Sequence, residues 1–340
     1  MERTKRRKLL FGAAALAAAP FARAQAPSRT ATLGVLSPSP PRTPEYWAKS
    51  PVTAKLKSLG WTYGENLRIE GAFSSGDTDR LPALAEGLVK KGVDVIWAIS
   101  PPAAVAAARA TRTIPVVFVR VVWPLELGLG RSLTRPGGNV TGVASIADPE
   151  VLVKPVFYLL EVVPGAKRAT VISPHSVIYK TVSGGEFSPK FGPQLQQKFD
   201  ALIGAREHRE HRVASVADIE AALADALAWP TDVLYVSSSP LIGSQTARIV
   251  GFALRNKLPS AFIEDTFVDA GGLLSYGSSV WGTIFESLEY VDAILRGADP
   301  AGLPIKLPAK MDLVINLRTA KALGLTVPQS LLLRADRVIE

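Results

Sequence analysis

The stretch DVIWAISPPAAVAAARATRTIPVVFV, residues 94–119, decides the fold of this chain. Its two ends are short apolar runs rich in Val and Ile, which predict buried strands over Asp94–Ser100 and Ile114–Val119. The Ala-rich segment between them predicts a helix near residues 102–111. Strand, helix and strand in this order form the unit from which parallel sheets covered on both faces are built. The sequence therefore predicts an α/β fold.

The same alternation extends in both directions from this unit. In the first half, further strands are expected over Ala31–Ser37, Asn66–Glu70 and Asn139–Val143, with helices near 45–59 and 78–91. After Pro149 it begins again, with strands expected over Ala169–Ser173, His208–Val213, Asp232–Ser238, Ser260–Ile263 and Leu273–Ser275, and helices near 151–161, 190–203, 216–228 and 243–257. A length of 340 residues suits two domains of ~150 residues each. We therefore expect two doubly wound parallel-sheet lobes.

The segment VWGTIFESLEYVDAILR, residues 280–296, follows the second series of strands. Its apolar residues Ile284, Leu288, Val291 and Leu295 recur at helical spacing, and Gly297 follows directly. A long helix is therefore expected here.

The charge of the chain is concentrated at its N-terminus. Six of the basic residues and one acid lie within the first 24 residues, so the net charge of +9 falls to +4 for the remainder. The remaining Lys and Arg residues are dispersed and form no basic run interleaved with aromatic residues, which argues against a nucleic-acid partner. The chain has no cysteine, so disulfides, thiolate nucleophiles, thiolate metal sites and a lipidated cysteine are excluded.

Residues 1–24 have the pattern of a cleavable signal peptide. A basic segment precedes the apolar stretch Leu9–Ala19, and Ala22 and Ala24 form an A-x-A site, so cleavage is expected near Ala24. Eleven apolar residues are too few to span a bilayer. The adjacent Arg6 and Arg7 leave both the general secretory and the twin-arginine route open. We expect a soluble, monomeric protein in the periplasm.

Candidate binding residues follow the expected strands. Ligands of doubly wound sheets bind at the carboxyl ends of the strands, where small hydroxyl residues at helix starts can hold a carboxylate or merely cap the helix. The residues expected at these ends are Ser37, Ser39, Ser100, Pro102, Ala103, Trp123, Thr141, His175, Ser237, Ser238, Ser239, Glu264 and Asp265. Neither a Gly-x-Gly-x-x-Gly motif nor a P-loop is present, so no nucleotide cofactor is expected.

Several of these residues admit two interpretations. Trp123 could stack on a planar ligand or pack between the lobes. His175 could lie in the cleft or in a solvated loop, whereas His208 and His211, in the segment REHREHR, suit an exposed strand or loop. A nucleophile such as Ser238 would need a positioned base, and no His, Asp or Glu cluster has metal-ligand spacing. We therefore expect neither an enzyme nor a metal site.

The chain resembles the ABC-transporter substrate-binding proteins whose better-known members take up tryptophan or tyrosine. The similarity runs from the first strand to the C-terminus. It is carried by LGW at 59–61, DTDRLPALAEGLV from Asp77, TIPVVFV from Thr113, RPGGNVTGV from Arg135, LEVVPGAKR from Leu160, AGGLLSYG from Ala270 and the final block MDLVINLRTAKALGLTVPQSLLLRADRVIE.

This resemblance implies a type I periplasmic binding protein fold with a three-segment hinge. The crossings are expected near 144–149, 270–279 and 302–312, which gives one lobe of residues 30–145 plus 278–303 and another of residues 148–270 plus 311–340. The implied ligand contacts are Ser37, Ser39, the Ser100–Ala103 turn, the segment around Trp123, Thr141 and Ser237–Ser239.

The implied function is capture of a small molecule, such as an aromatic amino acid or another carboxylate, for an ABC permease and its ATPase. A periplasmic subunit that senses a ligand and reports to a membrane receptor is the alternative. A repressor of the lactose type would need a helix-turn-helix where the signal peptide lies.

Two departures from relatives concern charge. Relatives tend to have Asp-Pro where this chain has Trp123-Pro124, and Ser or Arg where it has Glu264-Asp265. The acid that could meet a ligand's ammonium group would then come from the other lobe. A different ligand class is equally consistent with these departures.

Overall fold

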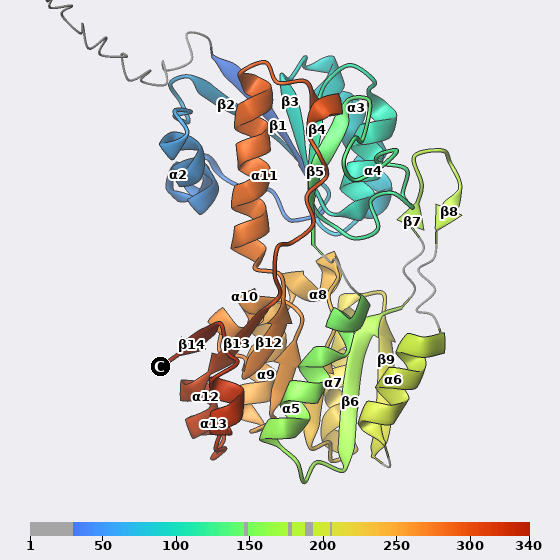
Figure 1. Cartoon of the computed structure of the whole chain (residues 1–340), viewed down its shortest axis with the longest axis vertical. Helices are drawn as coiled ribbons and strands as arrows, with labels where there is room; N and C mark the ends of the chain where they lie inside the picture. The colour runs from blue at the N-terminus through green and yellow to red at the C-terminus, as the bar shows by residue number, and fades with distance from the viewer. Residues whose placement is uncertain (1–29, 146–148, 176–178, 188–192, 205) are drawn as a thin grey trace, which may run out of the picture.

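Two α/β lobes, one above the other in Figure 1, make up the chain in this computed structural model. The structure describes residues 30–145, 149–175, 179–187, 193–204 and 206–340. The predicted signal peptide and the predicted start of the second lobe at residue 148 lie outside these residues. No helix within the described ranges is both long and apolar enough to cross a membrane.

The first lobe is built on a five-stranded sheet in the order β2-β1-β3-β4-β5, and every neighbouring pair of strands is parallel. Its strands are β1 (Ala31–Ser37), β2 (Leu67–Phe73), β3 (Val95–Ile99), β4 (Val116–Val121) and β5 (Val140–Ala144). The five strands expected in this half of the sequence are confirmed. In this order the chain winds outward in both directions from β1 and β3, so the carboxyl ends of these two strands flank the switch point.

Helices cover both faces of this sheet. Two of them, α3 (Leu81–Lys90) and α4 (Pro101–Ala110), bury one face in a cluster with Ile96 and Phe118. The other face is covered by α1 (Pro44–Lys49), α2 (Pro51–Ser58) and α11 (Val280–Leu295). The sequence predicts one helix over 45–59, but the structure has two, because Pro51 lacks the N–H that a continuous helix requires and Ser50 before it is extended.

The helix α11 confirms the prediction for residues 280–296, and it returns to the first lobe from far along the chain (Figure 1). Its Leu288 and Val291 are fully buried against the same cluster as Trp97. The indole N–H of Trp97 donates to the hydroxyl of Ser287 at 2.9 Å. These contacts close the second face of the sheet.

The second lobe contains a seven-stranded sheet in the order β14-β13-β12-β11-β10-β6-β9. Its strands are β6 (Arg168–Pro174), β9 (Glu207–Val213), β10 (Val233–Val236), β11 (Ser260–Phe262), β12 (Leu274–Gly277), β13 (Asp312–Asn316) and β14 (Arg337–Ile339). All neighbours are parallel except β12 and β13. The five strands from β9 to β12 repeat the winding order of the first sheet, with the switch point between β6 and β10.

Helices also sandwich this second sheet. One face carries α5 (Lys154–Val162), α6 (Pro193–Ile203), α12 (Leu317–Ala322) and α13 (Gln329–Leu332). The other carries α7 (Val216–Ala228), α8 (Pro240–Ser244), α9 (Thr246–Arg255) and α10 (Asp265–Asp269). The helix predicted over 243–257 is thus preceded by the separate short helix α8.

Three chain segments cross between the lobes and contact one another. The hydroxyl of Ser278 donates to the carbonyl of Ser145 at 2.7 Å, and the N–H of Ala144 donates to the carbonyl of Lys306 at 2.8 Å. The residue boundaries of the two lobes given above stay a prediction.

A short hairpin links the lobes a fourth time. Its strands, β7 (Tyr179–Lys180) and β8 (Glu186–Phe187), follow β6 of the second lobe in the chain but lie against the first lobe (Figure 1). The N–H of Val182 donates to the carbonyl of Leu127 at 2.9 Å, and Arg109 on α4 donates to the carbonyl of Thr181. The sequence analysis did not anticipate this hairpin, because strands of two residues carry no periodic signal.

The substitution Ser287→Ala is expected to destabilise the protein by about 1–3 kcal/mol, because it leaves the buried indole N–H of Trp97 without its acceptor. Urea unfolding followed by circular dichroism measures this change. Ser58→Ala, at an exposed helix end, is the control and should stay within about 0.5 kcal/mol. Equal effects of the two substitutions would contradict the anchoring of α11 by this bond.

A disulfide should lock the hairpin to the first lobe in the double variant Gly128→Cys/Val182→Cys. A Cβ at position 128 would lie 3.3 Å from the Cβ of Val182, slightly closer than in ordinary disulfides, and the φ of +79° at Gly128 adds backbone strain that the double variant must absorb. The chain has no other cysteine, so non-reducing gel mobility and thiol titration check the formation of this bond. Free thiols in an oxidised double variant whose circular dichroism matches that of the wild type would contradict the docking of the hairpin there.

Candidate functional site

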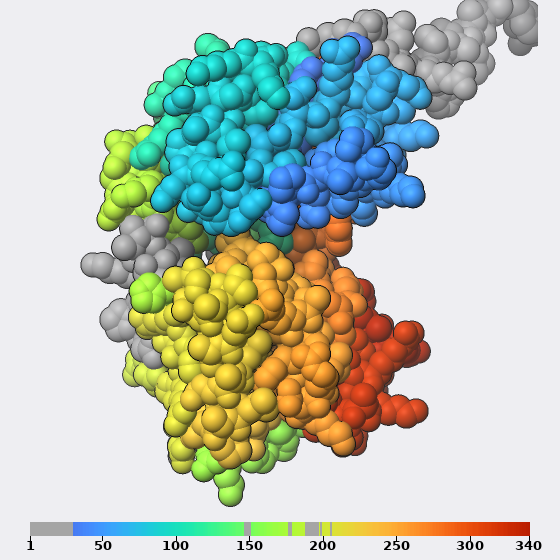
Figure 2. Space-filling view, turned by 180° about the vertical axis from the view of Figure 1, so that it is seen from behind, coloured from blue at the N-terminus to red at the C-terminus, as the bar shows by residue number. Residues whose placement is uncertain are grey.

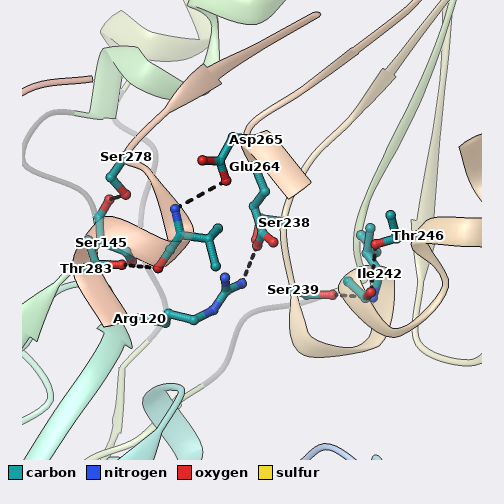
Figure 3. Close-up of polar contacts among 12 residues, drawn as sticks. Arg120, Ser145, Ser238, Ser239, Ile242, Thr246, Glu264, Asp265, Ser278 and Thr283 are labelled. Carbon is teal, nitrogen blue, oxygen red and sulfur yellow. Dashed lines mark hydrogen bonds and ion pairs between the residues drawn. The ribbon is translucent and has the colours of Figure 1, made fainter. Parts of the chain in front are cut away.

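The carboxyl edges of the two sheets face each other. Arg120, at the end of β4, reaches Glu264, which precedes α10 at the end of β11 (Figure 3). Figure 2 shows the two lobes meeting along a furrow. The residues that follow the strands of both sheets therefore lie at the boundary between the lobes, where doubly wound sheets bind ligands.

Buried serines end the first three strands of the first lobe. The hydroxyl of Ser37, at the end of β1, donates to that of Ser39 at 3.0 Å. Ser74 follows β2, and its N–H donates to the carbonyl of Ser37 at 3.1 Å. Ser100 follows β3 and begins α4. The hydroxyls of Ser74 and Ser100 are buried and have no hydrogen-bond partner among the described residues, so two donors at this edge are unsatisfied there.

Ser100 and Ser239 differ although both precede a proline at a helix start. Ser239 has an extended backbone, and its side chain accepts a hydrogen bond from the N–H of Ile242 at 3.2 Å, so it caps α8. Ser100 has φ +99° and makes no capping bond. The capping interpretation is therefore confirmed for Ser239 and wrong for Ser100. Pro101 and Pro102 also lack N–H groups, which weakens the start of α4 as an anion site.

Backbone strain gathers at the same edge. Five non-glycine residues have positive φ in the described part of the chain, and four of them, Ser75, Ser100, Arg120 and Trp123, lie in or directly after β2, β3 and β4. Such a conformation costs on the order of 1–3 kcal/mol and persists where function or packing requires it. Its concentration at one sheet edge identifies this edge as the candidate site.

Trp123 packs against the hairpin. Its ring centroid lies 6.0 Å from that of Phe187 and 6.5 Å from that of Tyr179. These contacts show that Trp123 packs against the hairpin, which lies between β6 and α6 in the sequence, and its role in stacking on a ligand stays a prediction. Burial raises the pKa of Tyr179 far above its usual value, which agrees with this enclosed position.

Four other predicted residues differ in how far they are buried. Thr141 is fully buried, and its hydroxyl donates to the carbonyl of Leu303 at 2.8 Å, within the first lobe. Ala103 is buried in the core beneath α4, beside the half-buried Pro102. His175 is exposed. His208 and His211 lie on β9, which confirms the expected exposed strand, and no cluster of possible metal ligands occurs among the described residues.

Arg120, Ser238 and the buried Glu264 form a partly buried charged group between the lobes. Nη2 of Arg120 lies 2.5 Å from Oε1 of Glu264, and the hydroxyl of Ser238 donates to the same oxygen. The neighbouring Ser237 is joined to β6 through its N–H and the carbonyl of Ile172 at 2.9 Å. The sequence analysis missed Arg120 and Ser74. The available signal for Arg120 was a single charge inside the apolar run VVFVRVV.

Asp265 joins the second lobe to the start of α11. One of its carboxylate oxygens accepts the N–H of Val280 at 3.2 Å (Figure 3). Desolvation by burial raises the pKa of Asp265 above its usual value, against the hydrogen bonds to Val280 and Ser279, which lower it. This carboxylate supports the hinge and is already engaged by a backbone donor.

A separate hollow of about 250 Å³ lies on the second lobe, between α5 and α6. It is lined by Val153, Lys154, Phe157, Tyr158 and Leu202, and it contains none of the predicted site residues. We therefore place the candidate site at the facing edges of the sheets and not in this hollow.

The comparisons with known proteins agree with this geometry. The chain matches the family described as ABC transporter substrate binding protein over residues 46–183 and 206–339. A tyrosine-binding protein of Clostridioides difficile strain R20291 is 29% identical over 279 residues, 82% of this chain and 76% of that protein. A conserved domain protein from Vibrio cholerae has a solved structure that is 27% identical, with a TM-score of 0.72 over 91% of this chain and 100% of that one. An ABC domain from Streptococcus pneumoniae, solved in complex with L-Trp, is 24% identical, with a TM-score of 0.71 and the same coverage.

The substitution Asp265→Asn tests the environment of this carboxyl group, since Asn keeps an oxygen that can accept the N–H of Val280. An acid whose pKa is raised by folding binds protons in the native state, so its contribution to the free energy of unfolding falls as the pH rises above about 4. The variant lacks this loss. We expect its stability relative to the wild type to increase between pH 4 and pH 7 in urea unfolding. A pH-independent or decreasing difference would contradict the raised pKa.

Proposed function

Because the chain belongs to the family of ABC transporter substrate-binding proteins, we propose that it is the solute-binding component of an importer. It captures a small molecule between its two lobes and delivers it to a membrane permease and the ATPase of that permease. In this proposal residues 1–24 direct export and are removed, and the remaining chain works as a monomer in the periplasm.

The unsatisfied hydroxyls of Ser74 and Ser100 carry this proposal. A buried donor without a partner costs about 1–3 kcal/mol, and a ligand that accepts from it offsets this cost. The strained backbone at Ser75, Ser100 and Arg120 holds the same edge in a fixed shape before a ligand arrives. Unsatisfied hydroxyl donors on a backbone of fixed shape favour ligand binding rather than catalysis. Ser238, the candidate nucleophile, instead donates to a carboxylate.

The proposed ligand is an aromatic amino acid or a related carboxylate. Two relatives support this class, one named for tyrosine and one solved with L-Trp. Serine hydroxyls are suitable donors to a carboxylate. In this proposal the ligand is lined by Ser37, Ser39, Ser74 and Ser100 from the first lobe and by Ser237 and Ser238 from the second, whereas Trp123 holds the hairpin.

The three crossing segments provide the hinge. Their contacts are few hydrogen bonds around Ser145, Ser278 and Lys306, whereas each lobe has its own extensive core. Rigid lobes joined by a few extended residues are suited to closure around a ligand.

The substitutions Ser100→Ala and Ser239→Ala distinguish a serine proposed to bind the ligand from a serine that caps a helix. Ser100→Ala removes an unsatisfied buried hydroxyl, so stability should be unchanged or raised, while affinity for the ligand should fall about 2-fold to 13-fold, the equivalent of one hydrogen bond. Ser239→Ala removes a helix cap and should cost about 1 kcal/mol of stability.

The measurement is thermal unfolding and calorimetric titration of the protein from Gln25 onward with L-tyrosine, L-tryptophan and L-phenylalanine. A ligand at 100 times its Kd stabilises by about 2.7 kcal/mol. The absence of both a thermal shift and a binding heat with all three amino acids would reject the proposed ligand class. Loss of stability without loss of affinity in Ser100→Ala would reject the proposed site.

A further inference from the structure

The ion pair between Arg120 and Glu264 joins the two lobes at their facing edges (Figure 3). Arg120 comes from β4 of the first lobe, and Glu264 follows β11 of the second. The hydroxyl of Ser238 donates to the same carboxylate oxygen as the guanidinium. Opposite charges from the two lobes therefore meet where a ligand would enter.

Because this ion pair is largely shielded from water, each of its two charges needs an opposite charge beside it. The Glu264 side chain is 9% exposed and that of Arg120 is 25% exposed. Removing one partner of such a pair leaves the other charge partly desolvated and without its counter-charge, which is destabilising. A ligand that separates Arg120 from Glu264 must consequently supply a new partner for both of them.

The backbone of the first lobe is bent to place Arg120. Its φ is +58°, and the pairing of β4 with β5 is irregular between Val119 and Val121. An undistorted strand alternates its side chains between the two faces of the sheet. The irregularity at Arg120 instead accompanies a side chain that reaches beyond the sheet edge to the other lobe.

The other carboxylate at this edge does not replace Glu264. Asp265 accepts the N–H of Val280 and a bond from Ser279, both at the start of α11. Glu264 is thus the carboxylate that faces the first lobe.

We propose that Arg120 and Glu264 are a specificity-determining pair that selects a zwitterionic ligand and rejects ligands with a net charge. This inference rests on the proposed binding function. The carboxylate of an amino acid replaces Glu264 at Arg120, and its ammonium group replaces Arg120 at Glu264, so both protein charges keep a partner. An acid without an ammonium group leaves Glu264 unpaired, and an amine without a carboxylate leaves Arg120 unpaired.

The test compares three probes with the same ring: L-tyrosine, 3-(4-hydroxyphenyl)propanoate and tyramine, titrated into the wild type, Arg120→Gln and Glu264→Gln. The wild type should bind tyrosine at least roughly tenfold more tightly than either analogue. In Glu264→Gln the preference for tyrosine over the propanoate should fall by roughly tenfold, and in Arg120→Gln the preference over tyramine should fall similarly.

Two further variants guard against misfolding of a single variant and against effects of removing any surface ion pair. The double variant Arg120→Gln/Glu264→Gln leaves no unpaired charge if a single variant fails to fold, and it should bind the three probes within a few-fold of one another. Glu289→Gln breaks the ion pair with Lys55, on the outer surface of the first lobe, and should leave all three affinities unchanged.

The outcomes separate this inference from the proposed function. Tyrosine binding with the wild-type preference retained in all three Arg120 and Glu264 variants would overturn the role of the pair and leave the binding function standing. Binding of the propanoate as tightly as tyrosine by the wild type would also overturn it. Failure of the wild type to bind any amino acid would reject both proposals.

Discussion

A parallel sheet must bury both of its faces, and the first sheet of this protein does so only with the help of α11, a helix that follows five of the seven strands of the second sheet in the sequence. Trp97 and Val117, on β3 and β4, lie in the cluster that α11 covers, and this helix begins at residue 280. Besides the hairpin of β7 and β8, the chain crosses between the lobes at residues near 145, 278 and 306. This arrangement places the carboxyl edges of the two sheets opposite each other and confirms the two-lobed type I periplasmic binding protein fold.

The side chains at the facing edges of the two sheets differ in polarity from those that fill the interiors of the lobes. Both lobes are filled by apolar clusters, whereas the edge of the first sheet contains unsatisfied serine hydroxyls and four residues with positive φ. The second lobe contributes Glu264, held by Arg120 and Ser238. Strain and unsatisfied polar groups reduce stability, so their presence at the edge of the first sheet supports the proposal that a ligand binds there.

The sequence predicts regular elements well and contacts between distant residues poorly. Alternating apolar runs and helical spacing located the central strands of both sheets and α11. The same Ser-Pro pattern preceded α4 and α8, yet Ser239 caps its helix and Ser100 does not, because the backbone of Ser100 is left-handed. Arg120 was missed because its partner Glu264 lies far away in the chain, and spacing carries no information about such a pair. The hairpin of β7 and β8 was missed because each strand has only two residues.

The position of α11 also constrains how the protein is made. The ribosome completes β5 at residue 144 but does not finish α11 until residue 295, and at about 5–20 residues per second this delay is on the order of ten seconds. During that time the apolar face that includes Trp97 lacks α11 and is covered only in part, by α1 and α2. A nascent chain in this state offers a long-lived target for chaperones that bind exposed apolar surface, and the first lobe can close only when most of the polypeptide has been synthesised.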